Sequence, residues 1–239
     1  MAQHDLYHPN RVTALFDEMS GTYGFVNLVA SLGFTYVWRY VVVSKISKQK
    51  DTDIVVVDLM SGMGELFSEL RSQIQGIQKI AAIDFSSKMC ERAREKVKEN
   101  PFPTEIIQGD VFDKHIPDQS ADIVVCSFGL KTFSLEQQKR LASEVKRILK
   151  PGGQFSFIEI SIPKNAVLRF LYSFYVQLII PFIGKICLGN PDNYRHLGIY
   201  TKNFGNSRNF HSFLAEQGLQ AQYFEHFYGC ASGVFGERS

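Results

Sequence analysis

The stretch that decides the fold is IVVVDLMSGMGE, residues 54–65. It starts with four β-branched residues without polar alternation, which is typical of a strand buried on both faces of a parallel sheet. The run ends in a carboxylate, Asp58, and then in a turn with Gly62 and Gly64, where the backbone can approach a ligand closely. A strand that passes through such a turn into a helix indicates the first βα unit of an α/β sheet.

The same alternation of short apolar strands and helices continues to residue 160. We expect further strands at 79–84, 104–108, 121–127 and 154–160. Helices are expected at 65–74, at 86–100 and from a capping box of Ser134 and Gln137 to Leu149, where Lys150-Pro-Gly-Gly153 stops the helix. Such repeated units predict a Rossmann-like, doubly wound and mostly parallel α/β sheet with helices on both faces.

The segments on either side of this core break the alternation. Residues 10–48 predict two helices, one near 12–19 and one over 26–48 with an interruption at Gly33. Residues 161–205 are rich in aromatic and apolar side chains, and we interpret them as a helical lid inserted after the fifth strand; a Pro-kinked pair of core helices is the alternative. A helix at 207–217 and strands at 219–228 and 230–235 complete the sheet.

The predicted organisation therefore has four parts. They are an N-terminal helical cap (1–50), a cofactor-binding α/β core (51–160), a lid or acceptor insertion (161–205) and a C-terminal helix with strands (206–239).

Composition excludes several classes of protein. The 26 basic and 24 acidic residues leave a net charge of +2, too little for the basic surface of a nucleic-acid-binding protein. The cysteines at 90, 126, 187 and 230 form no CxxC pair or Cys/His cluster, so we expect no metal site and a reduced cytoplasmic location. The polar first residues do not resemble a signal peptide. The apolar stretch between Arg169 and Lys185 is too short to span a bilayer, so we expect at most peripheral membrane contact.

The glycine turn favours S-adenosylmethionine (SAM) over a dinucleotide. The third glycine of the dinucleotide fingerprint is absent, because Phe67 stands at that position. Asp58 would repel a pyrophosphate, whereas it would attract the cationic amino-acid part of SAM. A purely structural turn with a capping aspartate is the alternative.

Three other predicted strands also lead to polar residues at the ligand edge of the sheet. Asp84 is placed to accept hydrogen bonds from two ribose hydroxyls, although it could instead cap the following helix. Asp110 can accept from an adenine amino group while the N–H of Val111 meets a ring nitrogen, and Ser127 can hold the amino-acid part of SAM.

With these residues the sequence resembles class I SAM-dependent methyltransferases of the ubiquinone/menaquinone biosynthesis (UbiE/Coq5-type) family. The resemblance covers nearly the whole chain, in the segments Leu15-Phe-Asp17, Tyr23-Gly24-Phe25-Val26-Asn27, Trp38-Arg39, Val57-Asp58-Leu59, Asp84-Phe-Ser-Ser-Lys-Met89, Ser127-Phe-Gly-Leu130, Leu149-Lys-Pro-Gly-Gly153, Ile158-Glu159, Tyr172-Ser173 and Asn193-Tyr-Arg-His-Leu197. It implies SAM contacts at Met63, Asp84, Asp110, Val111 and Ser127. The full cofactor site that we expect is Asp58, Ser61, Gly62, Met63, Gly64, Asp84, Phe85, Asp110, Val111, Ser127 and Tyr23.

The resemblance also implies an acceptor: an electron-rich aromatic ring with an isoprenoid tail, methylated on carbon. The sequence departs from the family on the acceptor side, with Lys131-Thr132 in place of Arg-Asn and Ile199-Tyr200 in place of Glu-Ser. Val234 replaces a histidine that is common in the family, and the glycine turn also differs. A specialised lipophilic substrate, such as a natural-product scaffold, is therefore the alternative to a quinone precursor.

Ionising a phenol-like acceptor requires a base, or a cation that stabilises the phenolate. We expect Arg195 or Lys131 to hold the oxyanion and His196 to act as base, with Tyr194 and Tyr200 in the same catalytic group. A solvated or hydrogen-bonded surface role is the alternative for His196. Tyr23 and Glu159 are further candidates on the acceptor side.

The sequence leaves two other functions open: O- or N-methylation of a small natural product, and SAM binding without methyl transfer. Release of S-adenosylhomocysteine with an acceptor separates the last case from an enzyme. We expect a small lipophilic substrate as partner and regard a homodimer as an option.

Overall fold

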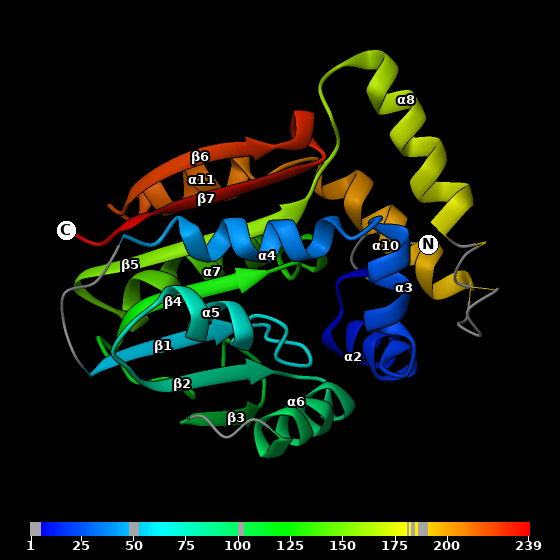
Figure 1. Cartoon of the computed structure of the whole chain (residues 1–239). Helices are drawn as coiled ribbons and strands as arrows, with labels where there is room; N and C mark the ends of the chain where they lie inside the picture. Colours follow the sequence, from blue (N-terminus) through cyan, green and yellow to red (C-terminus); the bar gives the residue numbers. More distant parts are fainter. Residues whose placement is uncertain (1–5, 48–52, 100–102, 181, 183–184, 186–190) are drawn as a thin grey trace.

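The computed structural model describes residues 6–47, 53–99, 103–180, 182, 185 and 191–239. Seven strands of these residues form a single sheet in the order β3-β2-β1-β4-β5-β7-β6. Strands β1 to β5 are parallel, whereas β7 pairs antiparallel with both β5 and β6. Figure 1 shows helices on both faces of this twisted sheet. The predicted doubly wound, mostly parallel α/β fold is confirmed.

The strands agree closely with those expected from the sequence. They are β1 (Ile54–Leu59), β2 (Ile77–Asp84), β3 (Thr104–Gln108), β4 (Ala121–Ser127), β5 (Leu149–Ile160), β6 (Gln220–His226) and β7 (Ala231–Glu237). One boundary was wrong, because β5 begins at Leu149 and not at Gln154. Leu149 already pairs with Ala121, and the register then shifts before Gln154 pairs with Ile123. Gly152, at φ 77°, provides the left-handed backbone within this irregular stretch.

The helices of the core pack on the two faces of the sheet. They are α5 (Phe67–Gln73), α6 (Ser87–Glu99), a short 3-10 turn η1 (Leu130–Thr132), α7 (Leu135–Ile148) and α11 (Arg208–Glu216). The capping box of Ser134 and Gln137 opens α7 as predicted. Helix α5 starts two residues later than expected, because the turn continues through Gly64 at φ 71°.

The N-terminal segment forms α2 (Pro9–Met19), α3 (Tyr23–Ala30) and α4 (Phe34–Ser44). The interruption expected at Gly33 is confirmed, but it separates two helices, α3 and α4, and does not merely interrupt one; residue 48 lies outside the described residues. Leu32 and Gly33 both adopt left-handed φ values, so the chain turns sharply between α3 and α4. No single helix among the described residues is both long and apolar enough to cross a membrane. Only α3 and α4 taken together have the length and composition of a membrane span, and the two helices meet at an angle of 97°.

The segment after β5 is helical where it is described. It forms α8 (Ala166–Phe174), a π-helical turn η2 (Tyr175–Ile179) and α10 (Pro191–Phe204). In Figure 1, α2, α3 and α10 gather at the end of the sheet to which the parallel strands point, and α8 projects away from it. Helices thus surround the ligand edge of the sheet, and the lid role of 161–205 stays a prediction.

The core has an apolar layer on each face of the sheet. Val57 and Val124 belong to one buried cluster, whereas their neighbours Val56 and Val125 belong to the other. Burial on both faces explains the uninterrupted apolar sequence of β1. A third cluster joins the N-terminal helices to α10, with Met19 and Tyr200 among its buried members. Cys90, Cys126 and Cys230 are buried and free, and Cys187 lies outside the described residues.

The topology places a ligand site between β1 and β4. From β1 the chain builds outward through β2 and β3, and then crosses to β4 on the other side of β1. At such a switch point the loops after the two central strands diverge and leave a crevice. The glycine turn after β1 and Ser127 at the end of β4 border this position.

Candidate cofactor and acceptor site

A cavity of about 520 Å³, including the space at its mouth, lies at this switch point; we call it the switch-point cavity. Its lining comes from the N-terminal helices, the ends of β1, β2 and β4, and the turns that follow them. The lining residues are Phe16, Tyr23, Arg39, Met60, Gly62, Glu65, Asp84, Phe85, Met89, Ser127, Phe128, Gly129 and Thr132. Five expected cofactor residues are therefore together here: Tyr23, Gly62, Asp84, Phe85 and Ser127.

Asp84 connects the ends of β1 and β2. One carboxylate oxygen accepts a hydrogen bond from the N–H of Gly62 at 2.8 Å, and the other accepts from the N–H of Ser86 at 2.9 Å. Burial raises the pKa of Asp84 to about 6, although both hydrogen bonds favour the charged form. Ser86 Oγ accepts from the N–H of Met89 at 3.1 Å, so this serine caps the start of α6. Asp84 thus lines the cavity with acceptor capacity left over, since a carboxylate can accept more than two hydrogen bonds.

Glu65 closes the glycine turn. Its Oε2 accepts from the N–H of Met63 at 2.9 Å, and a Cβ at Gly62 would lie only 2.7 Å from the same oxygen. Gly62 also has a φ of 55°, a left-handed conformation that favours glycine. A side chain at Gly64 would overlap the ring of Phe67. Phe67, which stands at the position of the third glycine of the dinucleotide fingerprint, therefore packs directly against the turn.

Asp58 is buried behind this turn. It is only 1% exposed, and neither carboxylate oxygen has a hydrogen-bond partner among the described residues. Burial raises its pKa well above the usual range, and the negative charges of Glu65 and Asp84 raise it further. A buried acid without partners is costly to the apo fold, and a cationic ligand nearby would reduce that cost.

The six other expected cofactor residues do not line the switch-point cavity. Ser61 is buried beside the turn, and Met63 packs against the N-terminal cluster. Asp110 accepts from the N–H of Phe112 at 3.0 Å, and Val111 is part of the core. Asp58 and Gly64 also lie outside the lining. The adenine contacts expected of Asp110 and Val111 stay a prediction.

Sequence reasoning missed several lining residues. Phe16 and Arg39 come from α2 and α4, far from the strand motifs in sequence. Both residues stand in segments that carry the family resemblance, so the sequence marked these segments but did not assign the two residues to the cofactor site. The remaining missed residues are Met60, Glu65, Met89, Phe128, Gly129 and Thr132.

A second and larger cavity of about 1260 Å³ lies next to the first; we call it the apolar cavity. Its lining is Tyr23, Asn27, Ser31, Leu32, Phe34, Thr35, Trp38, Phe128, Lys131, Ile160, Leu168, Tyr172, Tyr175, Ile180, Tyr194, Leu197, Gly198, Thr201, Phe227 and Cys230. Lys131 is the one charged side chain among these described residues. The apolar lining with few polar groups is typical of a site for a small lipophilic molecule.

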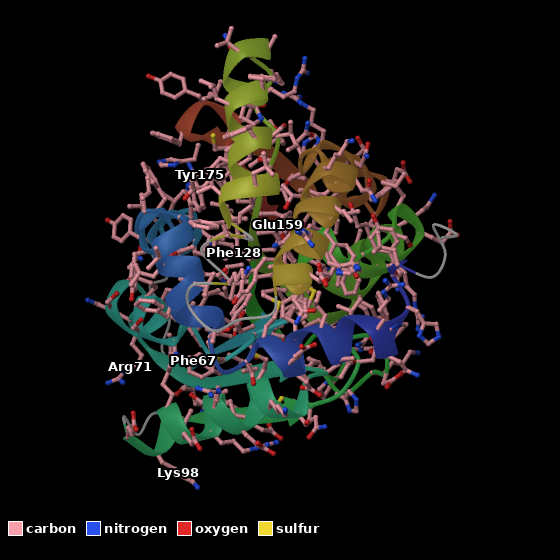
Figure 2. The ribbon with its side chains drawn as sticks, turned by 90° about the vertical axis from the view of Figure 1, so that its right-hand side faces the viewer. Phe67, Arg71, Lys98, Phe128, Glu159 and Tyr175 are labelled. Atoms are coloured by element: carbon pink, nitrogen blue, oxygen red, sulfur yellow. The ribbon has the colours of Figure 1, made fainter. Side chains whose placement is uncertain are left out.

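Tyr23 and Phe128 line both cavities and therefore form the boundary between them. Phe128 has a φ of 65°, a strained conformation for a residue with a large side chain. Figure 2 shows Phe128 and Glu159 in the interior of the molecule, whereas Arg71 and Lys98 point outward. Burial raises the pKa of the Tyr23 hydroxyl, so this group stays protonated and can donate a hydrogen bond at the boundary.

Lys131 is fixed in the wall of the apolar cavity by Glu159. Its Nζ lies 2.7 Å from Glu159 Oε1 and donates to the carbonyl of Phe128 at 3.2 Å. Glu159 is fully buried and also accepts from the backbone N–H of Lys131 and of Ile160. An ammonium has three N–H donors, so Lys131 can still donate one hydrogen bond to a molecule in the cavity.

The polar residues expected in the lid are not all at the cavity. Tyr194 lines the apolar cavity, with its hydroxyl 3.0 Å from Thr22 Oγ1. Arg195 is exposed and paired with Asp192 at 2.6 Å. These two neighbours in sequence therefore face different surroundings, as adjacent residues on a helix do.

His196 and Tyr200 also lie outside the lining of both cavities. His196 Nε2 is 3.2 Å from the Arg11 guanidinium, and its Nδ1 is 2.8 Å from the carbonyl of Asp192. Because a guanidinium only donates, Nε2 accepts and Nδ1 donates, which occupies both ring nitrogens. The Tyr200 hydroxyl donates to the carbonyl of Leu6 at 2.6 Å. The structure thus gives these two side chains contacts that hold the N-terminal segment against α10.

The residues of the switch-point cavity fit SAM. Glu65 in the lining, and Asp58 behind the turn, have carboxylate oxygens without hydrogen-bond partners among the described residues. Asp84 and Ser127 add acceptors, and Phe85 adds an aromatic face. A ligand with two positive charges, hydroxyls and an aromatic base matches this set. No three His, Cys, Asp or Glu side chains gather as a metal-binding group within the described ranges.

The fold and this cavity place the protein in the class I methyltransferases. It is an enzyme that uses SAM as its cofactor. The chain belongs to the ubiE/COQ5 methyltransferase family, whose model matches residues 5–237. The resemblance drawn from the sequence is therefore confirmed.

Known relatives cover nearly all of the chain. A demethylmenaquinone methyltransferase from Thermotoga maritima is 30% identical over 224 residues, which are 92% of this chain and 93% of that protein. Another from Chlorobaculum tepidum is 31% identical over 214 residues, which are 88% and 85% of the two chains. Among solved structures, a SAM-dependent methyltransferase from Aquifex aeolicus has the same fold, with a TM-score of 0.57, 18% identity and coverage of 83% and 88%.

Proposed function

We propose that this enzyme methylates a ring carbon of an electron-rich aromatic acceptor that carries an isoprenoid or similar lipophilic substituent. The observation that carries the proposal is the apolar cavity, which adjoins the switch-point cavity through Tyr23 and Phe128. The names of the relatives, demethylmenaquinone methyltransferases, support a quinone-like ring. A specialised-metabolite scaffold of similar shape fits the same cavity.

The chain's own residues position and polarise the acceptor. When bound, SAM supplies an electrophilic methyl group on a sulfonium. Lys131, held by Glu159, donates its free N–H to the oxygen of an acceptor that binds as its phenolate, after losing the phenol proton to solvent, and the negative charge makes the ring carbon more nucleophilic. The new carbon–carbon bond would form as the bond from the methyl carbon to sulfur breaks, and the proton of the methylated ring carbon would leave to solvent. The apolar walls exclude water, and Tyr23 and Phe128 orient the ring at the boundary between the cavities. Tyr194 on α10, whose hydroxyl lies 3.0 Å from Thr22 Oγ1, is a second polar group in the lining of the apolar cavity.

The test is a product analysis. The purified protein is incubated with SAM and a panel of polyprenyl phenols, naphthoquinols and small O- and N-nucleophiles, and S-adenosylhomocysteine is quantified. A methyl group located on a ring carbon by NMR supports the proposal. Methyl transfer to oxygen or nitrogen favours the alternative acceptor chemistry. SAM binding without formation of S-adenosylhomocysteine in the presence of any acceptor would contradict the proposal that the protein transfers a methyl group.

We also propose a cytoplasmic protein in peripheral contact with anionic membranes. Helix α8 buries no residue, and Val167, Phe170, Leu171 and Phe174 on it are each more than half exposed. Figure 1 shows this helix projecting from the body of the molecule. The segments 19–50 and 160–191, which line much of the apolar cavity, contain Lys and Arg but no Asp or Glu. Exposed apolar residues beside segments whose only charged residues are basic match an anionic lipid surface.

Vesicle binding tests this contact. The protein should sediment with phosphatidylcholine vesicles that contain phosphatidylglycerol, and less with phosphatidylcholine alone. The double variant Phe170→Ser and Phe174→Ser should lose binding, while Leu135→Ser, which changes an exposed leucine on α7, should retain it. Equal sedimentation of both variants would contradict the proposal.

A further inference from the structure

Arg39 and Glu65 form an unusual pair in the wall of the switch-point cavity. Arg39 Nη2 lies 3.8 Å from Glu65 Oε1, beyond hydrogen-bond distance, and the two side chains are only 11% and 13% exposed. Arg39 Nε and Glu65 Oε1 are buried and have no hydrogen-bond partner among the described residues. The structure thus holds a cation and an anion face to face, each with unused hydrogen-bonding capacity.

Such a pair is poorly explained as a stabilising contact. Removing two charges from water is costly, and a long ion pair without supporting hydrogen bonds recovers little of that cost. The other contact of the guanidinium is the Tyr36 ring, 5.9 Å away. Both charged groups line a cavity, so a bound molecule can reach both. A ligand with adjoining negative and positive groups would satisfy both residues at once.

Other charges near the cavity are already engaged or do not reach it. Lys96 donates to the carbonyl of Gly64 at 3.2 Å and is not part of the lining. Asp84 accepts from two backbone N–H groups, and Asp58 lies behind the turn. Arg39 is therefore the cation that the described lining offers to an anionic group, and Glu65 is the acid beside it.

We propose that Arg39 binds the carboxylate of the amino-acid end of SAM and that Glu65 binds its ammonium. The inference rests on SAM occupying the switch-point cavity and goes further, because it assigns the two charges of the zwitterion to two named side chains. An Arg fork suits a carboxylate, which it can bind through two parallel hydrogen bonds. The adjacent Trp38 lines the apolar cavity, so α4 contacts both halves of the site.

Calorimetry with two ligands tests the assignment without an acceptor. Decarboxylated SAM keeps the sulfonium, the ammonium and the nucleoside but lacks the carboxylate. The wild-type protein should bind SAM about 10- to 100-fold more tightly than this analogue, as expected for hydrogen bonds to a charged group. Arg39→Met should weaken SAM by a similar factor and leave the affinity for the analogue almost unchanged. Arg39→Lys should retain part of the preference.

The controls separate this inference from the cofactor assignment. Arg71→Met, on the exposed side of α5, should bind both ligands as the wild type does. Equal affinity of the wild type for SAM and its decarboxylated analogue would overturn the role of Arg39 while leaving SAM as the cofactor. Equal weakening of both ligands by Arg39→Met would assign it a structural role instead. If the folded wild type bound neither ligand, the site assignment itself would fall. Because the wild-type comparison needs no variant, it remains decisive even if Arg39→Met does not fold.

Discussion

Lys131 and Glu159 form a buried ion pair with 2.7 Å between Nζ and Oε1, on the wall of the cavity where we place the acceptor. Removing one partner leaves the other charge buried and only partly compensated. Lys131→Met should therefore destabilise the fold by roughly 3–5 kcal/mol. Combining it with Glu159→Gln should recover much of this loss, because this position then carries no buried charge and the amide oxygen can still accept from the backbone N–H groups of Lys131 and Ile160. Urea unfolding of the single and double variants measures both effects, and a double variant less stable than Lys131→Met would contradict the argument.

The volume of the apolar cavity should select the acceptor. Leu168 lines the cavity, whereas its neighbour Val167 is 70% exposed. Leu168→Trp should raise the KM for long-tailed acceptors by about tenfold or more, since lost apolar contact of about 1–3 kcal/mol corresponds to that factor. SAM affinity should not change. Val167→Trp is the matched control, and a similar rise in KM there would show that the effect is not specific to the cavity.

SAM affinity should fall as the pH is lowered through about 6. Burial raises the pKa of Asp84 to about 6, so below this pH the carboxyl is protonated and loses acceptor capacity toward hydroxyl groups. Calorimetric titrations between pH 5 and pH 8 would show the trend, with affinity highest at the upper end. Asp84→Asn should bind more weakly and flatten the dependence. A wild-type affinity that is constant across this range would rule Asp84 out of the site.

Asp58 should limit the stability of the ligand-free protein. Its pKa is raised in the fold, so the folded state favours the protonated form and loses stability as the pH rises above the pKa of the unfolded chain. Asp58→Asn should accordingly raise the Tm at neutral pH, by about 2–4 °C for each kcal/mol gained. The gain should disappear at acidic pH. It should be accompanied by weaker SAM binding, since the negative charge near the site is removed. Thermal unfolding at two pH values measures the first effect.

His196 should contribute more to stability than to turnover. The sequence alone led us to expect a base, with a rate loss of about a hundredfold on removal. In the structure both ring nitrogens of His196 are hydrogen-bonded, one to the Arg11 guanidinium and the other to the carbonyl of Asp192. His196→Ala should thus lower the free energy of unfolding by about 1–3 kcal/mol while keeping turnover within a few-fold. Arg195→Ala should change stability by less than about 1 kcal/mol, because its ion pair is exposed. A hundredfold loss of turnover in folded His196→Ala would restore the earlier interpretation.

The sequence by itself determined the sheet and the strand-end part of the site. Strands that are buried on both faces are largely apolar, so the runs at 54–57 and 123–126 could be recognised without context. Turn glycines and strand-end carboxylates are local features as well, and Gly62 and Asp84 accordingly line the cavity as expected. The break at Gly33 was expected, but the full separation into two helices was not, because it also needs Leu32 in a left-handed conformation that its residue type does not indicate.

Only the tertiary structure decided which side chains complete the site. Arg39 and Glu65 are 26 positions apart in sequence and meet through the packing of α4 beside the glycine turn, which no local pattern encodes. Helix α10 shows the converse. Tyr194, Arg195 and His196 are neighbours in sequence, yet the helical rotation between successive residues turns one toward the apolar cavity and the others away from it. Sequence proximity suggested a catalytic cluster, whereas the direction of each side chain on α10 assigned one residue to the cavity wall and the others to ion pairs and hydrogen bonds outside it.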